Sequence, residues 1–402
     1  MPDLSSFPST EIRFDRQARV IGGADAVAGL VGDHALTDLL VLVHGWNNDE
    51  HGAFHLYRAL TSSLRTVVDS DAFPALANRR IGAVAVFWPS IALTGLGREP
   101  DPGLIRDQIQ GLRPVFPDSS SQRTLDAAAA LVPRLPAVAD ARAGFADELR
   151  SLLVPTAMAP EDVPPDLFEL AGPDLMDRLS VPASLTSSEG TALVGGAWGA
   201  AQNLVNFTTY FAMKRRAGEI GELGLAPVLA AAPSGVRVHL VGHSFGARLV
   251  AAASKALPAD AVTTLALLQA AFSHHGFAED FEPGQHGYFR TVISDKKVTG
   301  PVLVTHTEND LAVGIAYALA SRISGNAAGF VGDVDDRYGG MGRNGARRTP
   351  EAVPAALLPV GSSYAWQPRR PHNLLADDFI KGHTDITGAE VAYALCAAVA
   401  GV

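Results

Sequence analysis

Residues 236–253 have the sequence VRVHLVGHSFGARLVAAA. The first six of these residues form a short strand-like run, and the Ala-rich part after Gly246 is typical of a helix. Ser244 therefore lies on a sharp turn between a strand and a helix. Such a turn needs small residues two positions before and two positions after the serine, and Gly242 and Gly246 meet this need. The turn directs the Ser244 hydroxyl toward the positive end of the helix, where an oxyanion is stabilised.

Short apolar runs alternate with longer helical patterns on both sides of this segment. Strands separated by helices pair in parallel, so the sequence predicts an α/β fold with a mostly parallel central sheet and helices on both faces. The N-terminal piece 12–20 is a candidate edge strand, and Pro359 weakens the last strand pattern. The predicted strands are 39–43, 81–87, 236–241, 264–268, 302–304 and 355–360, and the predicted helices include 53–68, 207–220 and 248–257.

Residues 91–200 interrupt the alternation because they carry no strand pattern and are rich in Ala, Leu, Pro and Asp. Apolar residues between 138 and 153 recur at helical spacing, and several prolines divide the segment into short helices. We expect a helical insertion that forms a lid over the sheet. It separates a first part of the core, 1–90, from a second part, 201–402. The alternative interpretation is a flexible surface excursion.

The composition limits the class of protein. Hydrophobic residues make up 47% of the 402 residues, which excludes a disordered chain. A net charge of −10 disfavours binding to nucleic acid. The single cysteine, Cys396, excludes an internal disulfide, and its apolar neighbours predict a core position. No signal peptide is visible and 191–210 makes a poor membrane span, so we expect a cytoplasmic protein without integral membrane association. Leaderless export would give the same pattern, and the oligomeric state is not indicated.

The Gly242–Gly246 pentapeptide GHSFG, with the strand before it and the Ala-rich helix after it, resembles the nucleophile turn of the α/β-hydrolase superfamily, in particular that of lipases and esterases. The resemblance covers about residues 36–90 and 203–402 and leaves the insertion out. It implies that Ser244 is a catalytic nucleophile, followed along the chain by an acid and then by a histidine near the C-terminus. A serine that only serves the turn is the alternative.

A serine hydroxyl needs a base to take its proton and a carboxylate to orient that base. The strand pattern at 302–304 leads into a loop that contains Glu308 and Asp310. A carboxylate that follows a buried parallel strand lies at the same edge of the sheet as the nucleophile. The resemblance implies Asp310 as the acid, with Glu308 as its competitor. Asp310 could instead cap the helix that starts near Leu311.

The base implied by the resemblance is His383. It lies in a loop just before a final helix, predicted at 389–398 and opened by the capping box Thr387 to Glu390. His372 is the alternative base, and an ordinary loop histidine is the alternative role for His383.

The oxyanion of the tetrahedral intermediate needs two hydrogen-bond donors. The resemblance implies the backbone N–H of Phe245, directly after the nucleophile, and that of Trp46, in the loop after strand 39–43. The loop contains His44-Gly45 and is not of the HGGG type, so the analogy rests on these two residues. Trp46 could also simply pack at the end of the strand.

Four other patterns are less informative. The G-x-G-x-x-G at 340–345 has no strand before it, which argues against a dinucleotide site. The aspartates of 333–336 indicate an acidic turn rather than a calcium loop. His51 and His55 have the spacing of a helical metal pair, but the zinc-protease pattern fails. Residues 214–216, KRR, indicate an exposed helix face rather than a phosphate site. We therefore expect no metal and no cofactor.

The expected reaction is two-step hydrolysis of a carboxylic ester through Ser244, His383 and Asp310, with an acyl-enzyme intermediate. The apolar insertion suggests a small-molecule ester with an apolar acyl or alcohol part as the substrate. A thioesterase or a serine peptidase would use the same three residues. Further alternatives are a non-catalytic binding protein of the same fold and a lipolytic protein that acts at a membrane surface.

Overall fold

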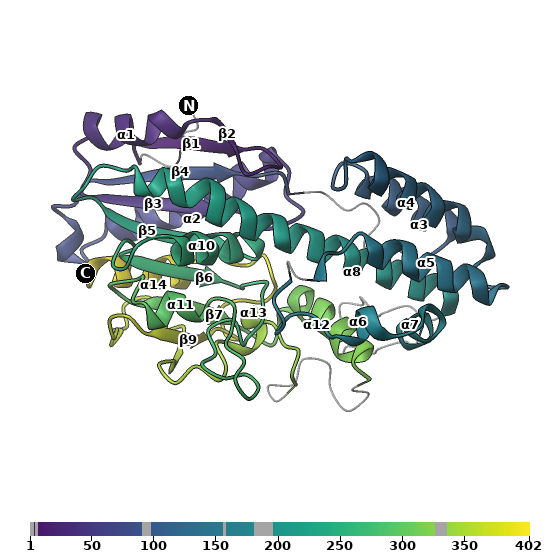
Figure 1. Ribbon diagram of the computed structural model, residues 1–402. Coiled ribbons are helices and arrows are strands. Elements are labelled where there is room, and N and C mark those ends of the chain that lie inside the picture. Colours follow the sequence, from purple (N-terminus) through teal and green to yellow (C-terminus); the bar gives the residue numbers. More distant parts are fainter. Residues whose placement is uncertain (1–3, 5–6, 91–97, 156–157, 181–195, 326–335) are drawn as a thin grey trace. The chain divides into compact units, whose positions relative to one another are not determined.

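The computed structural model describes residues 4, 7–90, 98–155, 158–180, 196–325 and 336–402 (Figure 1). The chain divides into two compact units. Unit 1 comprises Met1–Ser90, Arg216–Val313 and Gly340–Val402, and unit 2 comprises Ile91–Arg215 and Gly314–Gly339. The boundaries between the units fall within two helices, α8 (Gly196–Glu219) and α12 (Leu311–Ile323).

Unit 1 contains a nine-stranded sheet in the order β2-β1-β4-β3-β5-β6-β7-β9-β8. Only the β1–β2 pair is antiparallel among the strands of the described ranges, so the predicted mostly parallel α/β sheet is confirmed. The strands are β1 (Ser9–Phe14), β2 (Val20–Gly22), β3 (Asp38–Val43), β4 (Ile81–Phe87), β5 (Arg237–His243), β6 (Thr264–Leu268), β7 (Val302–His306), β8 (Val353–Ala356) and β9 (Pro371–Leu375).

The two ends of the sheet differ from the prediction. The segment expected as one edge strand at 12–20 forms β1 and β2, joined by a turn in which Ala18 has a φ of 60°, and β2 is the edge. The strand expected at 355–360 ends at Ala356 as β8. Strand β9 was not predicted, because its sequence PHNLL is short, begins with proline and lacks a clear apolar pattern.

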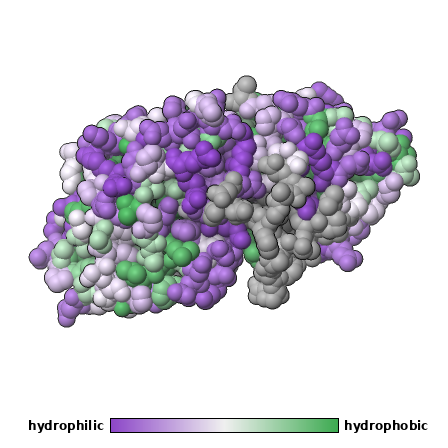
Figure 2. All heavy atoms as spheres, turned by 90° about the horizontal axis from the view of Figure 1, so that it is seen from below, coloured by the Kyte–Doolittle hydropathy of each residue, from purple (hydrophilic) through white to green (hydrophobic). Residues whose placement is uncertain are grey.

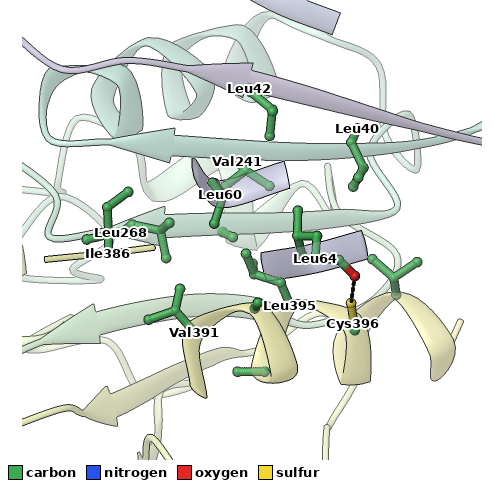
Figure 3. Packing of buried hydrophobic residues seen from close by; sticks show 14 of the residues in the cluster. Leu40, Leu42, Leu60, Leu64, Val241, Leu268, Ile386, Val391, Leu395 and Cys396 are labelled. Carbon is green, nitrogen blue, oxygen red and sulfur yellow. Dashed lines mark hydrogen bonds between the residues drawn. The ribbon is translucent and has the colours of Figure 1, made fainter. Parts of the chain in front are cut away.

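The helices of unit 1 cover both faces of the sheet. α2 (Glu50–Val68) and α14 (Ala389–Ala400) pack against each other on one face, and α10 (Phe245–Ala256) packs along β5 outside that core (Figure 1). Figure 3 shows Leu60 and Leu64 of α2 beside Leu395 and Cys396 of α14, beneath strand residues such as Val241. Cys396 is thus in the core, as expected. The remaining helices are α1 (Ala24–Asp33), η1 (Pro74–Leu76), η4 (Ile220–Leu225), α9 (Ala226–Ala230), α11 (Arg290–Ser294) and α13 (Met341–Asn344).

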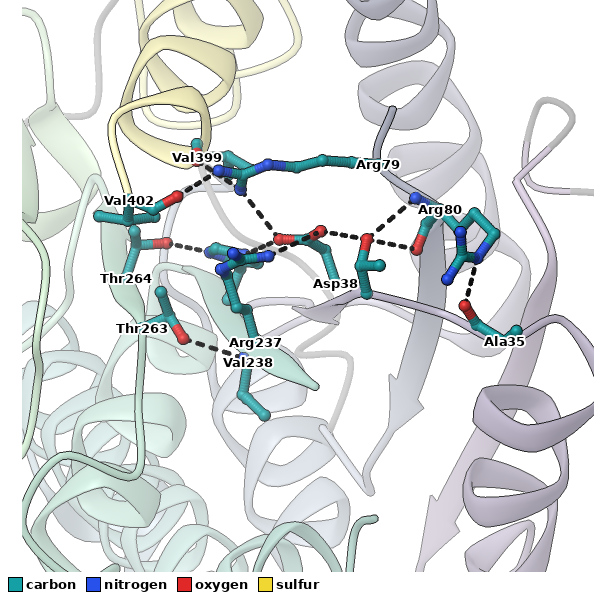
Figure 4. A network of polar contacts seen from close by, with 12 residues as sticks. Ala35, Asp38, Arg79, Arg80, Arg237, Val238, Thr263, Thr264, Val399 and Val402 are labelled. Carbon is teal, nitrogen blue, oxygen red and sulfur yellow. Dashed lines mark hydrogen bonds and ion pairs between the residues drawn. The ribbon is translucent and has the colours of Figure 1, made fainter. Parts of the chain in front are cut away.

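A polar network joins the amino ends of the central strands to α14 (Figure 4). Asp38 of β3 is fully buried and accepts hydrogen bonds from Arg79 (3.0 Å) and His239 (3.0 Å). Arg79 also donates to the carbonyl of Val399 at 2.8 Å. Burial raises the pKa of Asp38, but the hydrogen bonds from His239 and Thr37 and the charge of Arg79 outweigh it and lower that pKa. The polar groups at the amino ends of the central strands are thus paired with one another. Ligands of parallel sheets bind at the opposite, carboxyl ends of the strands.

In the ranges 98–155, 158–180 and 196–215, unit 2 consists of helices joined by turns and irregular segments, and these ranges contain no strand. Its extent differs from the predicted insertion, 91–200, because it continues to Arg215 and takes in 314–339 from far along the chain. The apolar stripe predicted to line a lid is buried where α5 packs on α4 and α7. The helices are α3 (Pro102–Leu112), α4 (Ser119–Leu131), η2 (Val132–Arg134), α5 (Ala139–Ser151), α6 (Asp166–Glu169), α7 (Gly172–Leu179), and parts of α8 and α12.

The basic run 214–216 was predicted to be exposed, and this prediction is wrong. Lys214 and Arg216 are buried, with exposed fractions of 2% and 7%. Within unit 2, the Lys214 ammonium lies 2.5 Å from Asp162 and donates to the Tyr317 hydroxyl at 2.7 Å. The carboxylate of Asp162 thus balances the charge of Lys214 in the interior of unit 2. A short basic run in the sequence does not reveal that a buried carboxylate lies beside one of its residues.

Figure 2 shows one face of the molecule, on which apolar surface is divided into small patches by hydrophilic residues. None of the helices in the described ranges is long and apolar enough to cross a membrane.

Candidate active site

Ser244 lies between β5 and α10 in a strained backbone conformation, with φ 57° and ψ −120°. A non-glycine residue in such a conformation costs about 1–3 kcal/mol, so its surroundings must enforce it. A Cβ at Gly242 would lie 2.3 Å from the Gly246 carbonyl oxygen, and a Cβ at Gly246 would lie 2.1 Å from that of Val43. The Ser244 N–H donates to the Leu268 carbonyl at 3.0 Å. The two glycines are thus required by close packing around the serine.

A continuous chain of hydrogen bonds joins the serine, histidine and aspartate that the sequence singled out. The Ser244 Oγ lies 2.8 Å from His383 Nε2. The other ring nitrogen, Nδ1, lies 3.0 and 2.9 Å from the two carboxylate oxygens of Asp310. Asp310 is fully buried, whereas the His383 side chain is 19% exposed. The buried carboxylate favours the tautomer with a proton on Nδ1, which leaves Nε2 free to accept the serine proton.

The two alternative residues lie elsewhere. Glu308 is exposed, its N–H donates to Asp377, and its carbonyl accepts from Arg343. His372 lies in β9, and its Nε2 accepts the N–H of Gln367 at 3.0 Å. Neither side chain joins the hydrogen-bonded chain.

Asp310 also caps α12, which was the structural alternative for this residue. Its Oδ1 accepts the N–H of Val313 at 3.1 Å. The capping role and the contact with His383 therefore hold together, because a carboxylate has room for several donors.

The loop that carries His383 is tied to the serine turn and to the acid loop. His243 donates from Nε2 to the His383 carbonyl at 2.8 Å. Asn309 donates to the Ile380 carbonyl at 2.9 Å. These two hydrogen bonds hold the loop that carries His383 in place. Neither bond could be predicted from the sequence, because each joins segments that lie far apart in the chain.

The loop after β3 runs past the serine. A Cβ at Gly45 would lie only 2.7 Å from the Ser244 Cβ, so the backbone at this point must be glycine. The rings of Trp46 and Phe245 are in contact, with centroids 5.7 Å apart. The backbone segments named as oxyanion donors therefore flank the serine.

Buried side chains hold this loop in place. Tyr57 of α2 accepts the His44 N–H at 2.7 Å and donates to the Val86 carbonyl at 2.5 Å, which links the ends of β3 and β4. The His44 ring donates from Nδ1 to the Gly45 carbonyl at 2.8 Å and stacks on Trp88. The loop is thus preorganised by groups that were not predicted from the sequence.

Gln269 also contacts the site and was not predicted from the sequence. It directly follows β6, is fully buried, and donates from Nε2 to Asp310 Oδ2 at 3.2 Å. A signal existed, because polar residues that follow buried parallel strands collect at one edge of the sheet.

The structure shows where the other sequence patterns lie within the described ranges. Residues 340–345 form the short helix α13 and its flanks, with no strand directly before it. His51 and His55 face each other, 2.9 Å apart between Nε2 atoms, without a third ligand. Within the described ranges no cluster of three or more His, Cys, Asp or Glu could hold a metal ion. Residues 333–335 of the acidic turn lie outside these ranges.

Comparison of the chain with models of known protein families, with curated proteins and with solved structures gives no match.

The buried histidines predict how stability depends on pH. Burial lowers the pKa of His44 to about 4 and that of His243 to about 3, and it also lowers that of His239. The unfolded chain therefore binds protons below its ordinary histidine pKa of 6.5 that the folded chain does not bind. The stabilising contribution is full above pH 6.5 and is lost as the pH falls toward 4, with a limiting slope of about 1.4 kcal/mol per pH unit for each histidine.

Urea unfolding at pH 7, 6 and 5 measures this slope. The variant His243→Gln is expected to reduce the slope by about 1.4 kcal/mol per pH unit, which corresponds to one proton. His34→Gln, at an exposed position, serves as the control and is expected to leave it unchanged. A free energy of unfolding that stays constant from pH 7 to pH 5 would contradict the prediction.

Proposed function

We propose that the chain is a serine hydrolase of the α/β-hydrolase fold that cleaves carboxylic esters. The observation that carries the proposal is the continuous contact from Ser244 through His383 to the buried Asp310. A strained serine at the end of a parallel strand, hydrogen-bonded to a histidine that a carboxylate orients, is the arrangement that activates a hydroxyl as a nucleophile.

The order of the parts along the sheet supports the fold assignment. In α/β-hydrolases the serine turn joins a strand to a helix, one oxyanion donor comes from the loop after the third strand, and the acid precedes the histidine. Here the loop after β3 holds Trp46, the turn after β5 holds Ser244, Asp310 follows β7 and His383 follows β9. All four loops leave the carboxyl ends of parallel strands, where ligands bind in such sheets.

In the proposed mechanism, Ser244 Oγ attacks the ester carbonyl carbon while His383 Nε2 takes its proton. The backbone N–H groups of Phe245 and Trp46 stabilise the oxyanion of the tetrahedral intermediate. The imidazolium is stabilised by Asp310, and it then returns its proton to the leaving alcohol. Water repeats the sequence on the acyl-enzyme, releases the carboxylic acid and regenerates Ser244.

The substrate preference and the lid remain predictions. The apolar composition of the insertion was the basis for expecting an apolar acyl or alcohol part, but the apolar stripe of α5 within it is used in the packing of unit 2. The stripe therefore gives no support for an apolar substrate. A series of esters with increasing acyl length tests this expectation separately from the reaction type.

Labelling with a fluorophosphonate tests the proposed reaction. The reagent resembles the tetrahedral intermediate and reacts with a serine that a base has activated. We expect one adduct, mapped by mass spectrometry to Ser244, and none in Ser244→Ala. The matched control is Ser254→Ala, a buried serine of α10 whose Oγ donates to the Val250 carbonyl at 2.8 Å. This variant should label like the wild type.

An ester, a thioester and an amide of one acyl group then separate the alternatives. The proposal predicts the highest kcat/KM for the ester, with all turnover lost in Ser244→Ala. A folded wild-type protein that neither labels nor hydrolyses any of the three would overturn the assignment as an enzyme. A preference for the thioester or the amide would retain the nucleophile and change the reaction.

A further inference from the structure

Gln269 is held in an unusual conformation beside the acid of the site. Its backbone has a φ of 47°, and the side chain is fully buried. The Nε2 atom lies 3.2 Å from Asp310 Oδ2 and 2.9 Å from the Gly342 carbonyl oxygen. Both neighbouring atoms accept hydrogen bonds, so the amide must point its nitrogen toward them.

The surroundings fix the position of Gln269. Its N–H donates to Thr305 Oγ1 at 3.1 Å on the neighbouring strand β7. The Gly342 N–H donates to the Ala270 carbonyl at 2.9 Å, and a Cβ at Gly342 would lie 2.5 Å from the backbone carbon of Gln269. A left-handed glutamine costs about 1–3 kcal/mol, and strain of this kind collects at functional sites. The G-x-G-x-x-G segment thus packs against Gln269.

Asp310 receives donors that fix both of its oxygens. Oδ1 accepts the Val313 N–H, Oδ2 accepts the Gln269 amide, and His383 Nδ1 lies within 3.0 Å of each oxygen. Within the described ranges, Gln269 and His383 are the side chains that donate to this carboxylate. A carboxylate with both oxygens bound cannot rotate away from the imidazole without breaking these bonds.

We propose that Gln269 is a positioning residue, whose amide orients the Asp310 carboxylate toward His383. The inference deepens the proposed function and rests on it. An amide suits this place because it donates a hydrogen bond and carries no proton that it could transfer. A second carboxyl group there would share a proton with Asp310, since two buried carboxylates in contact do not both ionise readily.

The test compares Gln269→Met with Gln269→Glu. Met keeps the volume and removes the donor, so we expect kcat to fall on the order of 10- to 100-fold with KM near the wild-type value. The control is Gln367→Met, at an exposed position of unit 1, which should leave kcat unchanged.

Gln269→Glu gives a readout that a merely structural role would not produce. The new carboxyl group is buried beside Asp310, so its pKa will be raised. When protonated, its O–H donates to Asp310 as the amide does, and when ionised it repels Asp310. We expect kcat/KM of this variant to decline on the alkaline side of its pH profile, and we expect no such decline in the wild type or in Gln269→Met.

A proton NMR signal of His383 Nδ1–H keeps the inference separate from the proposed function. This proton lies in the bond to Asp310, so its strongly downfield resonance should be sharp in the wild type and shifted or broadened in Gln269→Met, whether or not the protein turns over an ester.

The outcomes distinguish the inference from the proposed function. If the wild type labels and hydrolyses, and kcat of Gln269→Met lies within twofold of the wild-type value, the inference alone is overturned. A wild type without turnover would overturn the proposed function, and an unchanged resonance in Gln269→Met would then overturn the inference as well. If Gln269→Met does not fold, absence of the alkaline decline in Gln269→Glu overturns it.

Discussion

Asp310→Asn is expected to lower kcat for ester hydrolysis by about 10⁴-fold, with a smaller effect on KM. The asparagine keeps the shape of the side chain and can still accept the Val313 N–H. It carries no charge to stabilise the His383 imidazolium, and its NH₂ group can turn toward Nδ1 and favour the tautomer that cannot take the serine proton. Steady-state kinetics near pH 8 measures the loss, with circular dichroism to check the fold.

Glu308→Gln is the matched control, because Glu308 lies in the same loop and its side chain is exposed. We expect its kcat within twofold of the wild type. Near-wild-type turnover in Asp310→Asn, or a large loss in Glu308→Gln, would show that Asp310 has been given the wrong role.

Among the variants proposed for this protein, Lys214→Met is expected to lose the most stability, about 3–5 kcal/mol in the free energy of unfolding. Lys214 and Asp162 are each 2% exposed, and the substitution removes the cation that lies 2.5 Å from this buried carboxylate. The Tyr317 hydroxyl, which donates to Asp162 at 2.8 Å, cannot replace the lost charge. Urea unfolding measures the loss, and hydrogen exchange should show it in the unit 2 parts of α8 and α12.

Two comparisons make this prediction specific. Arg369→Met breaks a surface pair in which Arg369 and Asp260 are 39% and 54% exposed, and it should cost less than about 1 kcal/mol. The double variant Lys214→Met/Asp162→Leu removes both charges and should regain most of the lost stability, since apolar groups often replace a buried ion pair without cost. Equal effects of Lys214→Met and Arg369→Met would contradict the burial of this pair.

Local patterns were sufficient for most of the fold in unit 1. The strands 81–87 and 264–268 have the predicted bounds, because continuous apolar runs of that length mark strands buried on both faces. The serine turn was visible because its pattern is local: a strand before it, an Ala-rich helix after it, and a glycine two positions to either side of the serine. Ser244 and Asp310 follow strands that the sequence reveals, so the sequence predicts that these two residues lie at the same ends of the parallel strands. His383 was placed by the resemblance and by its loop before the last helix, because the strand that precedes it, β9, was not predicted.

The parts that could not be predicted depend on contacts between distant segments. Strand β9 is polar at its centre, and its place between β7 and β8 is a tertiary property. The basic residue Lys214 was expected to be exposed because the sequence does not reveal that Asp162 lies beside it. Gln269 and His243 act through a carboxylate and a carbonyl far along the chain, and single glutamines and histidines carry no pattern of their own.

The packing of α14 on α2 has a consequence for how the chain reaches its native state. Leu60 and Leu64 of α2 are covered by residues of α14 such as Leu395, which belongs to the opposite end of the sequence. A ribosome synthesises α2 long before residues 389–400, so the growing chain exposes the apolar face of α2 during most of its translation. Nascent chains with uncovered apolar surface are prone to aggregate and are bound by chaperones. Completion of the core on this face must therefore follow translation of α14, and the yield of native protein in a cell depends on how well the unfinished chain is protected until then.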